Sequence, residues 1–365
     1  MVIDAAGTRA SAPEPTVKEA RAALPAFSRQ RSTARGLAHF GATLAVYLIH
    51  VGAVFGVSTW GWRVPLALLN GLTIGMLFIV GHDACHGSLT SQSSLNKWLA
   101  RIAFLPSLHP LAAWEYSHNA MHHGWTNLRG RDPVYAPLTI EEYSALSPRR
   151  RRFERLCRSW VGMLPLYLVT IWWSLEMAPS SEHRRHIDKR GTFPFDRTLV
   201  LAFIALECVV AVLRARALSG ATLASIAAVT ATCVVVPFLS FAWLMGFATF
   251  QHHTHPRVRW YADETEWTYF RSQVQGTVHI VFPPWLEQVL HHIMEHTAHH
   301  VDTRVPLYNL VGAQRAVEEH FGAENVIAER FSFRGMSRTF RECQLYDYRR
   351  HTWMTFAGET IDTAE

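Results

Sequence analysis

Residues 64–87 read VPLALLNGLTIGMLFIVGHDACHG, an apolar run that leads directly into a pair of histidines. The run from 64 to 81 carries no charge and approaches the ~20 mostly apolar residues that a membrane-crossing helix needs. His82 and His86 are four residues apart, so their rings lie on one face of the same helix. The stretch therefore predicts an integral membrane protein that presents metal-ligating side chains at the end of a span.

Three further histidine clusters follow along the chain: SHNAMHHG (117–124), QHHTHP (251–256) and HHIMEHTAHH (291–300). Together the four clusters hold 13 of the 21 histidines. The spacings of His118 with His122 and of His296 with His299 again place two rings on one helical face. Neutral imidazole is a common metal ligand, so the repeated spacing predicts more than one metal ion.

The identity of the metal does not follow from the ligand type. Nine of the clustered rings would supply about four or five nitrogens to each of two metals, and imidazole suits zinc, iron, copper and nickel. Zinc has no redox chemistry, whereas iron with open positions can activate dioxygen. An adjacent pair such as His122 and His123 can serve two metals, or one metal and its surroundings.

Several residues beside these candidate ligands have a less definite role. Surplus histidines in a metal cluster often orient the ligands rather than bind the ion, and carboxylates can do the same by accepting a ring N–H. The histidines in this position are His252, His255, His291 and His292. The carboxylates are Asp83, Glu295 and Asp302.

The composition agrees with a membrane protein that keeps a sizeable aqueous part. The chain has 365 residues, of which 49% are hydrophobic and 18% charged, and its net charge is +6. The basic excess is interpreted as attraction to an anionic membrane surface, because no nucleic-acid-binding motif is present. The five cysteines are scattered, which fits a reducing compartment rather than a disulfide framework. The N-terminus shows no signal-peptide pattern.

Four membrane spans are predicted, over residues 37–58, 64–81, 198–213 and 221–250. The last would reach about 45 Å as a helix, more than a bilayer core, so its C-terminal end should carry QHHTHP into the water. Residues 160–176 are apolar but short. If they crossed, QHHTHP would face away from the first two clusters, so they are interpreted as an interfacial or re-entrant helix.

The orientation follows from the charged loops. Arg149–Arg152 precedes the short apolar segment, and basic loops mark the cytoplasmic side. The histidine clusters and both termini are therefore predicted to be cytoplasmic. Residues 1–16 are expected to be disordered and 17–34 to lie at the membrane surface. One domain, 35–355, follows, then a short tail, 356–365. The polar C-terminal region, 257–365, should wrap around the clusters as a cap.

The motifs resemble those of the membrane-bound fatty acid desaturases, specifically the acyl-lipid branch. HDACHGSL, YSHNAMHHGWTN and HTAHHVDTRVPLYNL are similar, in order and spacing, to the three histidine boxes of that family. TFQHHTHP followed by EWTYFR resembles the segment that supplies an extra ligand, which maps to His253. His252 and His255 remain alternatives for that ligand. The resemblance covers about residues 16–355, and VKEARAALPAFSRQRS resembles the family's lead-in to the first span.

The resemblance implies an all-α integral membrane fold with four transmembrane helices below a cytosolic helical cap. It implies two non-haem iron ions, with no catalytic residue separate from their ligands. Those ligands would be His82, His86, His118, His122, His123, His253, His296, His299 and His300. The reaction would use dioxygen and two electrons, break an acyl C–H bond and release water, with the acyl chain in an apolar tunnel.

The partners implied are membrane lipids, a fatty acyl substrate and an electron donor. The acyl carrier stays open between a lipid, CoA, an acyl carrier protein and the free acid. No HPGG haem-binding motif is present, so electrons are expected from an external carrier such as a ferredoxin. The basic residues at 149–152 and 184–185 are suited to attracting an acidic donor, although positive-inside topology alone also accounts for them.

Other functions remain as alternatives. The same di-iron scaffold could act as a fatty acid hydroxylase, an alkene-forming fatty acid decarboxylase or a carotenoid ketolase. Ketolases are generally shorter and lack the lead-in and the HTHP segment. A metal transporter would place ionisable residues within its spans. Here the predicted spans hold only His39, His50 and Glu207, which favours a reaction centre over a conduit.

Overall fold

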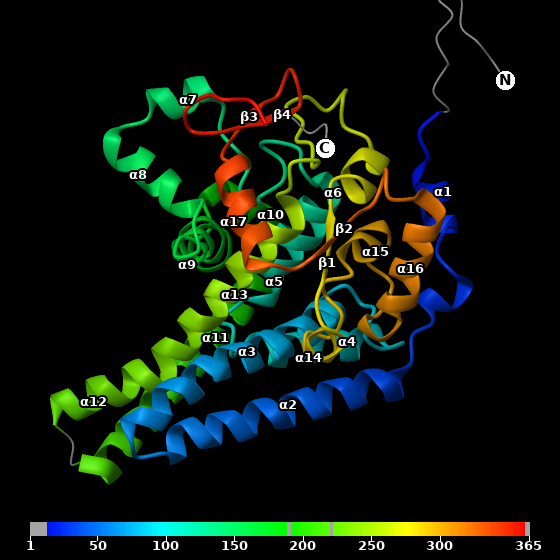
Figure 1. The fold of residues 1–365 in the computed structure, drawn as a ribbon. Coiled ribbons are helices and arrows are strands. Elements are labelled where there is room, and N and C mark those ends of the chain that lie inside the picture. The colour runs from blue at the N-terminus through cyan, green and yellow to red at the C-terminus, as the bar shows by residue number, and fades with distance from the viewer. Residues whose placement is uncertain (1–12, 188–190, 220–221, 362–365) are drawn as a thin grey trace, which may run out of the picture.

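The computed structural model describes residues 13–187, 191–219 and 222–361, so most of the predicted disordered segment, 1–16, lies outside the described residues. The described chain is mostly helical. Its long helices run together through the lower part of the molecule, and shorter elements cover one end of them (Figure 1). Within the described residues, four helices are long and apolar enough to cross a membrane: α2 (Thr33–Gly56), α3 (Trp60–Cys85), α11 (Phe193–Ser219) and the continuous run Leu223–His253.

The first two spans differ from their predicted bounds, because Arg63 does not interrupt α3. Residues 59–63, which separate the first two predicted spans, are helical from Trp60, and α3 continues to Cys85. The Arg63 guanidinium is buried and donates from Nε and Nη2 to the carbonyl of Val57 at 3.0 and 2.7 Å. Carbonyls at a helix end lack intrahelical donors. The charge therefore caps α2 and is compatible with an unbroken α3.

The third span is also longer than predicted, because the helix continues past residue 213, its predicted end, through Ser219. Near its start, Asp196 is buried and pairs with Arg101 at 2.7 Å. Near its end, Arg214 donates to the carbonyl of Gly56 at 2.6 Å. Both charges thus have partners on neighbouring elements, which allows the helix to extend past the apolar segment.

The fourth span consists of three consecutive segments: α12 (Leu223–Thr230), the π-helical turn η5 (Ala231–Val235) and α13 (Val236–His253). It contains 31 residues. Its last turn includes His252 and His253, so the third histidine cluster begins at the end of this span, as the sequence predicts.

The short apolar segment forms α9 (Met163–Pro165) and the π-helix η3 (Leu166–Met177), and its length falls below that of the four spans. It packs beside α13. The indole of Trp243 donates to the carbonyl of Trp160 at 2.8 Å, and that of Trp172 donates to Leu108 at 2.9 Å. These contacts hold the segment against α13 and against the loop that contains Leu108.

The remaining elements form what we call the cap, residues 13–32, 86–162 and 254–361, above one end of the long helices (Figure 1). Its helical elements are α1 (Val17–Ala22), η1 (Ala26–Arg29), α4 (Ser93–Phe104), α5 (Leu111–Trp114), η2 (Glu115–His122), α6 (His123–Trp125), α7 (Ile140–Ala145), α8 (Pro148–Cys157), η6 (Phe270–Val274), α14 (Pro284–Val289), α15 (His296–Val301), η7 (Leu307–Asn309), α16 (Leu310–Phe321) and α17 (Phe333–Glu342). Helix α10 (Ser181–Ile187) follows η3.

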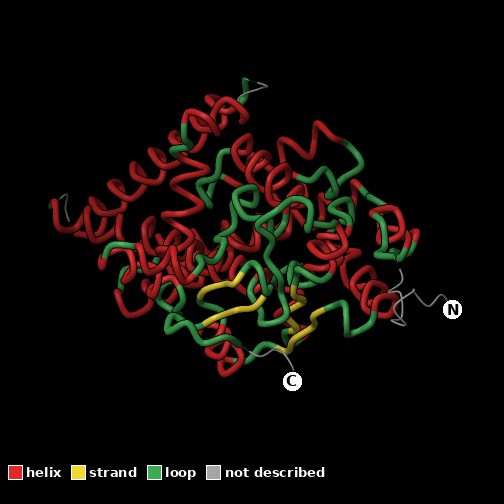
Figure 2. Tube along the Cα trace, turned by 90° about the horizontal axis from the view of Figure 1, so that it is seen from above, coloured by secondary structure: helices red, strands yellow, loops and turns green. Residues whose placement is uncertain are grey.

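Strands are few and short, as Figure 2 shows. Among the described residues, β1 (Val278–Val281) pairs in parallel with β2 (Ile327–Arg330), and β3 (Leu345–Asp347) pairs antiparallel with β4 (Thr352–Met354). The register of the first pair joins Val278 to Ile327. These small sheets tie the C-terminal region into the otherwise helical cap.

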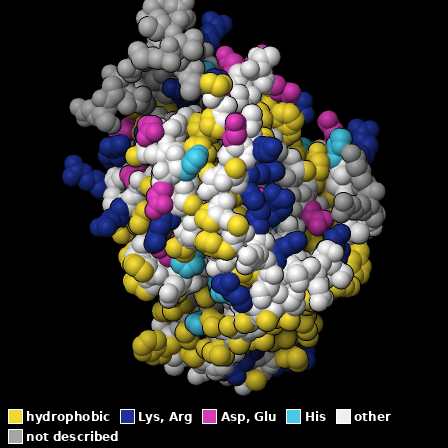
Figure 3. Space-filling view, turned by 90° about the vertical axis from the view of Figure 1, so that its right-hand side faces the viewer, with side chains coloured by type: hydrophobic (Ala, Val, Ile, Leu, Met, Phe, Trp, Pro, Cys, Tyr) yellow, Lys and Arg dark blue, Asp and Glu magenta, His cyan; other side chains and the backbone are white. Residues whose placement is uncertain are grey.

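The surface divides along the same line as the fold. Hydrophobic side chains cover the lower part of the molecule in Figure 3, and acidic and basic side chains are concentrated above it. Exposed apolar residues on α2, α3 and α11 include Ile49, Leu68 and Val209. Apolar surface of this extent marks a membrane-facing region. The chain is therefore a membrane protein with a polar cap.

Candidate metal centre

Nine histidines come together where the long helices meet the cap, in two groups. Group one contains His82, His86, His118, His123 and His299. Group two contains His122, His253, His296 and His300. Each histidine offers one ring nitrogen, and within each group these nitrogens lie within 4.8 Å of one another. The structure thus divides the nine sequence-predicted ligands into sets of five and four.

Five segments position these rings. His82 lies in the last turn of α3 with His86 at its C-cap, and His253 is the last residue of α13. The second box lies on the π-helix η2 and the first residue of α6, and the third box lies on α15. π-helical segments are rare overall but frequent at functional sites.

Both adjacent histidine pairs are divided between the two groups. His122 belongs to group two and His123 to group one, whereas His299 belongs to group one and His300 to group two. Successive helical residues point about 100° apart, so one short helix can supply both groups. η2 with α6 and α15 therefore hold the two groups at a fixed separation.

Within each group, ring nitrogens lie at hydrogen-bonding distance from other ring nitrogens. In group one, the Nε2 of His118 lies 2.8 Å from that of His82 and 3.1 Å from that of His123. In group two, the Nε2 atoms of His253 and His296 are 3.0 Å apart. Several neutral imidazoles cannot all satisfy one another at such distances, because each carries a single N–H. A cation between them would resolve the conflict, so the residues fit metal ions.

The electrostatic environment favours the neutral, ligating form of the rings. Burial, reinforced by the neighbouring imidazoles, holds the pKa values of His86, His118 and His123 well below their ordinary range. Burial and neighbouring rings act in the same direction on the pKa values of His296, His299 and His300. The rings therefore favour the neutral form, in which one nitrogen of each ring keeps the lone pair that metal coordination requires.

Two polar residues that the sequence analysis did not single out orient rings of group two. The Asp132 carboxylate accepts from His122 Nδ1 at 3.0 Å, and the Gln273 side-chain carbonyl lies 2.7 Å from His300 Nδ1. Each contact leaves Nε2 of that ring to face the group, an arrangement common around metal-bound histidines. Asp132 is the first carboxylate after the second box, a signal that could have identified it, whereas Gln273 has no such signal.

The remaining candidates lie beside the two groups and are not members of either. His252 stacks on His296 with ring centroids 3.7 Å apart, and its Nε2 lies 3.1 Å from the sulfur of Met294. His255 pairs with Glu329 at 3.4 Å. His291 Nε2 lies 2.9 Å from the hydroxyl of Thr43 on α2.

The three candidate carboxylates also differ in their contacts. Asp83 Oδ1 is 3.6 Å from His82 Nδ1, and its other oxygen accepts from the backbone of Leu307. Glu295 contacts His292 at 3.0 Å. Asp302 pairs with Arg29 at 2.6 Å and with Arg304 at 2.7 Å. Asp302 thus ties the N-terminal lead-in to the end of α15 rather than contacting a ring.

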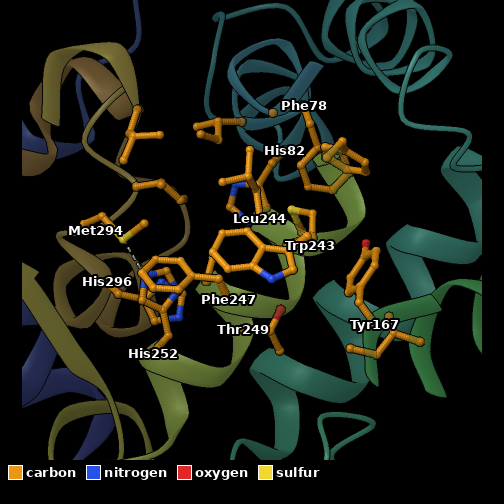
Figure 4. A pocket seen from close by; sticks show the side chains of 18 of the residues that line it. Phe78, His82, Tyr167, Trp243, Leu244, Phe247, Thr249, His252, Met294 and His296 are labelled. Carbon is orange, nitrogen blue, oxygen red and sulfur yellow. Dashed lines mark hydrogen bonds between the residues drawn. The ribbon is translucent and has the colours of Figure 1, made fainter. Parts of the chain in front are cut away.

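An apolar cavity of about 340 Å³ runs along the histidine groups. Its wall includes His82 and His118 of group one and His253 and His296 of group two. Most of the remaining wall is apolar, and much of it is aromatic: Phe78, Trp114, Trp160, Tyr167, Phe241, Trp243, Phe247, Phe282, Phe331 and Phe333. Figure 4 shows Trp243, Phe247, His252 and His296 among the side chains that line the cavity. The shape and chemistry suit a long apolar ligand held against both groups.

A buried carboxyl group contacts the segment that carries the second histidine box. Glu176, near the end of η3, accepts from the Ser117 hydroxyl at 2.6 Å, and Ser117 directly precedes His118. Burial raises the pKa of Glu176 to about 8. Nearby, His109 Nε2 lies 2.8 Å from the hydroxyl of Tyr167, and burial lowers the pKa of His109 to about 3. These contacts fasten η3 to the segment that carries the second box.

Comparisons with known proteins agree with this arrangement. Residues 58–331 match the family model described as "Fatty acid desaturase". The chain is 29% identical to the "sn-1 oleoyl-lipid 12-desaturase" of Picosynechococcus over 85% of this chain and 86% of that protein. It is also 29% identical to the enzyme of the same name from Anabaena variabilis, over 92% and 91%. The "sn-1 acyl-lipid omega-3 desaturase (ferredoxin)" of Synechocystis is 26% identical over 84% and 81%.

Proposed function

The chain belongs to the fatty acid desaturase family, and on that premise we propose that it desaturates acyl chains of membrane lipids with two histidine-bound iron ions and dioxygen. Its action as a fatty acyl desaturase, and so as an oxidoreductase, follows from the family and from the named relatives. The proposal adds the metal, its ligands, the oxidant, the acyl carrier, the electron donor and the orientation in the membrane.

The observation that carries the metal proposal is the convergence of nine imidazole rings beside an apolar cavity. The five nitrogens of group one and the four of group two would each hold one iron ion. Iron bound there would supply the oxidising chemistry, in which dioxygen and two electrons are used, two hydrogens leave the acyl chain and water forms. Imidazole ligation suits iron, and desaturation needs a redox-active metal.

The protein's own contribution is to position the substrate and exclude water. The aromatic wall of the cavity would hold the acyl chain extended past the rings of His82 and His296, both of which line it. Holding a C–H bond at a fixed place replaces a rare encounter with a prearranged one. Asp132 and Gln273 would keep His122 and His300 aimed at the ion by holding their Nδ1 positions.

The acyl carrier is proposed to be a membrane glycerolipid. Relatives over most of the chain are named for oleoyl-lipid and acyl-lipid substrates. The membrane-facing helices α3 and α13 also line the cavity, through residues such as Leu72 and Phe241. A chain entering from the bilayer would therefore stay in apolar surroundings along its path.

The electron donor is proposed to be a ferredoxin, which is printed in the name of one relative. Helix α8 carries Arg149–Arg152, of which Arg149, Arg150 and Arg152 are exposed on the cap. An acidic carrier would be attracted to such a surface, and its association rate would depend on ionic strength. With such a donor, the cap and the histidine groups would lie on the cytoplasmic side.

The same scaffold performing hydroxylation, decarboxylation or carotenoid ketolation is not favoured, because the relatives found are named as desaturases. Nor is metal transport, since the histidines gather at the ends of spans beside an apolar cavity. No separate observation favours a second function.

Reconstitution tests the proposal directly. The purified full chain would be supplied with iron and placed in lipid nanodiscs that contain an oleoyl glycerolipid. Ferredoxin, its reductase and NADPH would be added, with oleoyl-CoA as the alternative substrate in a parallel sample. We expect oxygen-dependent loss of oleoyl chains in the lipid and little in the CoA ester. Activity on the CoA ester alone would contradict a membrane glycerolipid as the acyl carrier. Activity with zinc in place of iron would contradict iron as the metal.

A further inference from the structure

A smaller cluster of ligating side chains lies in the cap and contains none of the nine histidines. It comprises His279 on β1, Glu287 in α14 and Glu295 directly before α15. Each offers one ligand atom, and these atoms lie within 4.8 Å of one another. The three residues come from different elements, so the fold rather than a local motif brings them together.

The histidine of this cluster is held in the orientation typical of a metal ligand. His279 Nδ1 contacts Glu318 Oε1 at 2.6 Å, and the same oxygen accepts from the side-chain amide of Gln314 at 2.8 Å. A carboxylate at Nδ1 fixes the proton there and leaves the lone pair on Nε2. His279 Nε2 is buried and has no hydrogen-bond partner in the part of the chain that the structure describes.

The buried carboxylate of Glu295 is the second indication of a bound ion. The side chain of Glu295 is only 4% exposed. One oxygen contacts His292 Nδ1 at 3.0 Å, while Oε2 is buried and finds no partner among the described residues. An unpartnered carboxylate oxygen away from water is costly. Two unsatisfied buried atoms within one small cluster point to a bound cation.

Glu287 completes the set from the solvent side. It is half-buried, and its Oε1 accepts from the backbone N–H of Phe282 at 3.0 Å, which fixes the side chain near the start of α14. An ion could therefore enter past Glu287 and reach the buried donors. One imidazole and two carboxylates leave one tetrahedral position for water.

We propose that His279, Glu287 and Glu295 bind a zinc ion distinct from the histidine-ligated pair. Neutral imidazole and two carboxylates balance the charge of a divalent cation, and zinc readily takes this donor set in tetrahedral geometry. The ion would join β1, α14 and the residue before His296. It would thus fix the start of α15, and with it α14, whose Leu286 lines the acyl cavity. This role is structural and does not depend on which acyl substrate is used.

Metal content and X-ray absorption test the site in the full-length, iron-loaded protein. The chain would be dialysed against micromolar zinc chloride, and its iron and zinc measured by mass spectrometry. The variants are His279→Asn and Glu287→Gln. The matched controls are His320→Asn and Glu319→Gln, which make the same changes at exposed positions on α16.

We expect about one equivalent of zinc in the wild type and in both controls, and its loss from both cluster variants with the iron retained. The zinc edge of the wild type should show one imidazole and oxygen ligands, whereas zinc misplaced into the histidine groups would show several imidazoles. Zinc absent from the wild type, zinc retained by both cluster variants, or an all-imidazole spectrum would each overturn the proposal. The wild-type spectrum decides the matter even if a variant fails to fold.

Discussion

At the scale of single residues, the histidine pairs explain how a short chain segment can serve two metals. Same-face spacing led to the expectation that rings such as His118 and His122 point together, and their rings do stack, with centroids 5.3 Å apart. The two nevertheless belong to different groups. Which ring goes to which group depends on the π turns of η2 and on the position of α15. Sequence spacing identifies candidate ligands without assigning them to one group or the other.

The carboxylate of Asp132 offers a test of ring orientation. It is buried and accepts from His122 Nδ1 at 3.0 Å and from the backbone of Asn127 at 2.7 Å. We expect Asp132→Asn to lower iron affinity by about 10- to 100-fold, because the ring loses the charged partner that holds its tautomer. Iron retention during chelator titration measures this. Asp263→Asn, at an exposed turn, is the control, and equal retention in the two variants would contradict the role.

At the scale of elements, partners far along the chain decide where helices end. Hydropathy located the four spans correctly, but it placed breaks at Arg63 and Arg214. In the fold both guanidiniums donate to the carbonyls that end α2. Composition cannot show such pairing, because it depends on which helix lies alongside. The π segments η3 and η5 likewise have no signal in the hydrophobic pattern.

The contact between η3 and η2 predicts a pH dependence of stability. The pKa of Glu176 is raised from 4.5 to about 8, with burial as the cause. Between these values the folded state binds more protons than the unfolded state, so the free energy of unfolding falls as pH rises. The loss is at most about 1.4 kcal/mol per pH unit. Below pH 4.5 both states are protonated and the effect vanishes.

Glu176→Gln should remove this slope while keeping an oxygen for the Ser117 hydroxyl. Thermal unfolding in detergent between pH 5 and 8 would show the wild type losing stability with pH and the variant changing less. The stability of the variant relative to the wild type should therefore increase as the pH rises. Glu182→Gln, at an exposed position on α10, is the control. Parallel curves for wild type and Glu176→Gln would refute the assignment.

At the scale of the whole molecule, four spans are predicted to place the cap and its histidines on one side of the membrane. The sequence predicts this through parity, because a crossing by residues 160–176 would separate the clusters. The structure agrees: this segment is shorter than a span, and all nine histidines meet. The pair between Asp302 and Arg29 joins the N-terminal lead-in to the end of α15. This pair links distant parts of the chain and could not be read from local sequence.

Cysteine labelling in a bacterial host would test the proposed orientation. Ser58 is exposed between α2 and α3, and Ser94 is exposed at the start of α4 on the opposite side. With the cap cytoplasmic, Ser58→Cys should react with a membrane-impermeant maleimide on intact cells, and Ser94→Cys only after permeabilisation. The unsubstituted chain gives the background from its own cysteines. The reverse pattern of labelling would contradict a cytoplasmic cap and would place it on the other side of the membrane.

The most direct test of the whole account is the fatty acid profile of a bacterial host that expresses the chain together with a ferredoxin. It would be measured by gas chromatography–mass spectrometry beside hosts expressing His299→Ala and His300→Ala, one ligand from each group. We predict a new unsaturated acyl chain in membrane lipid with the wild type and none with either variant, although both variants insert in the membrane. A variant that still forms the product would contradict the assignment of both groups to catalysis, and a hydroxy acid or alkene in place of the unsaturated chain would contradict desaturation.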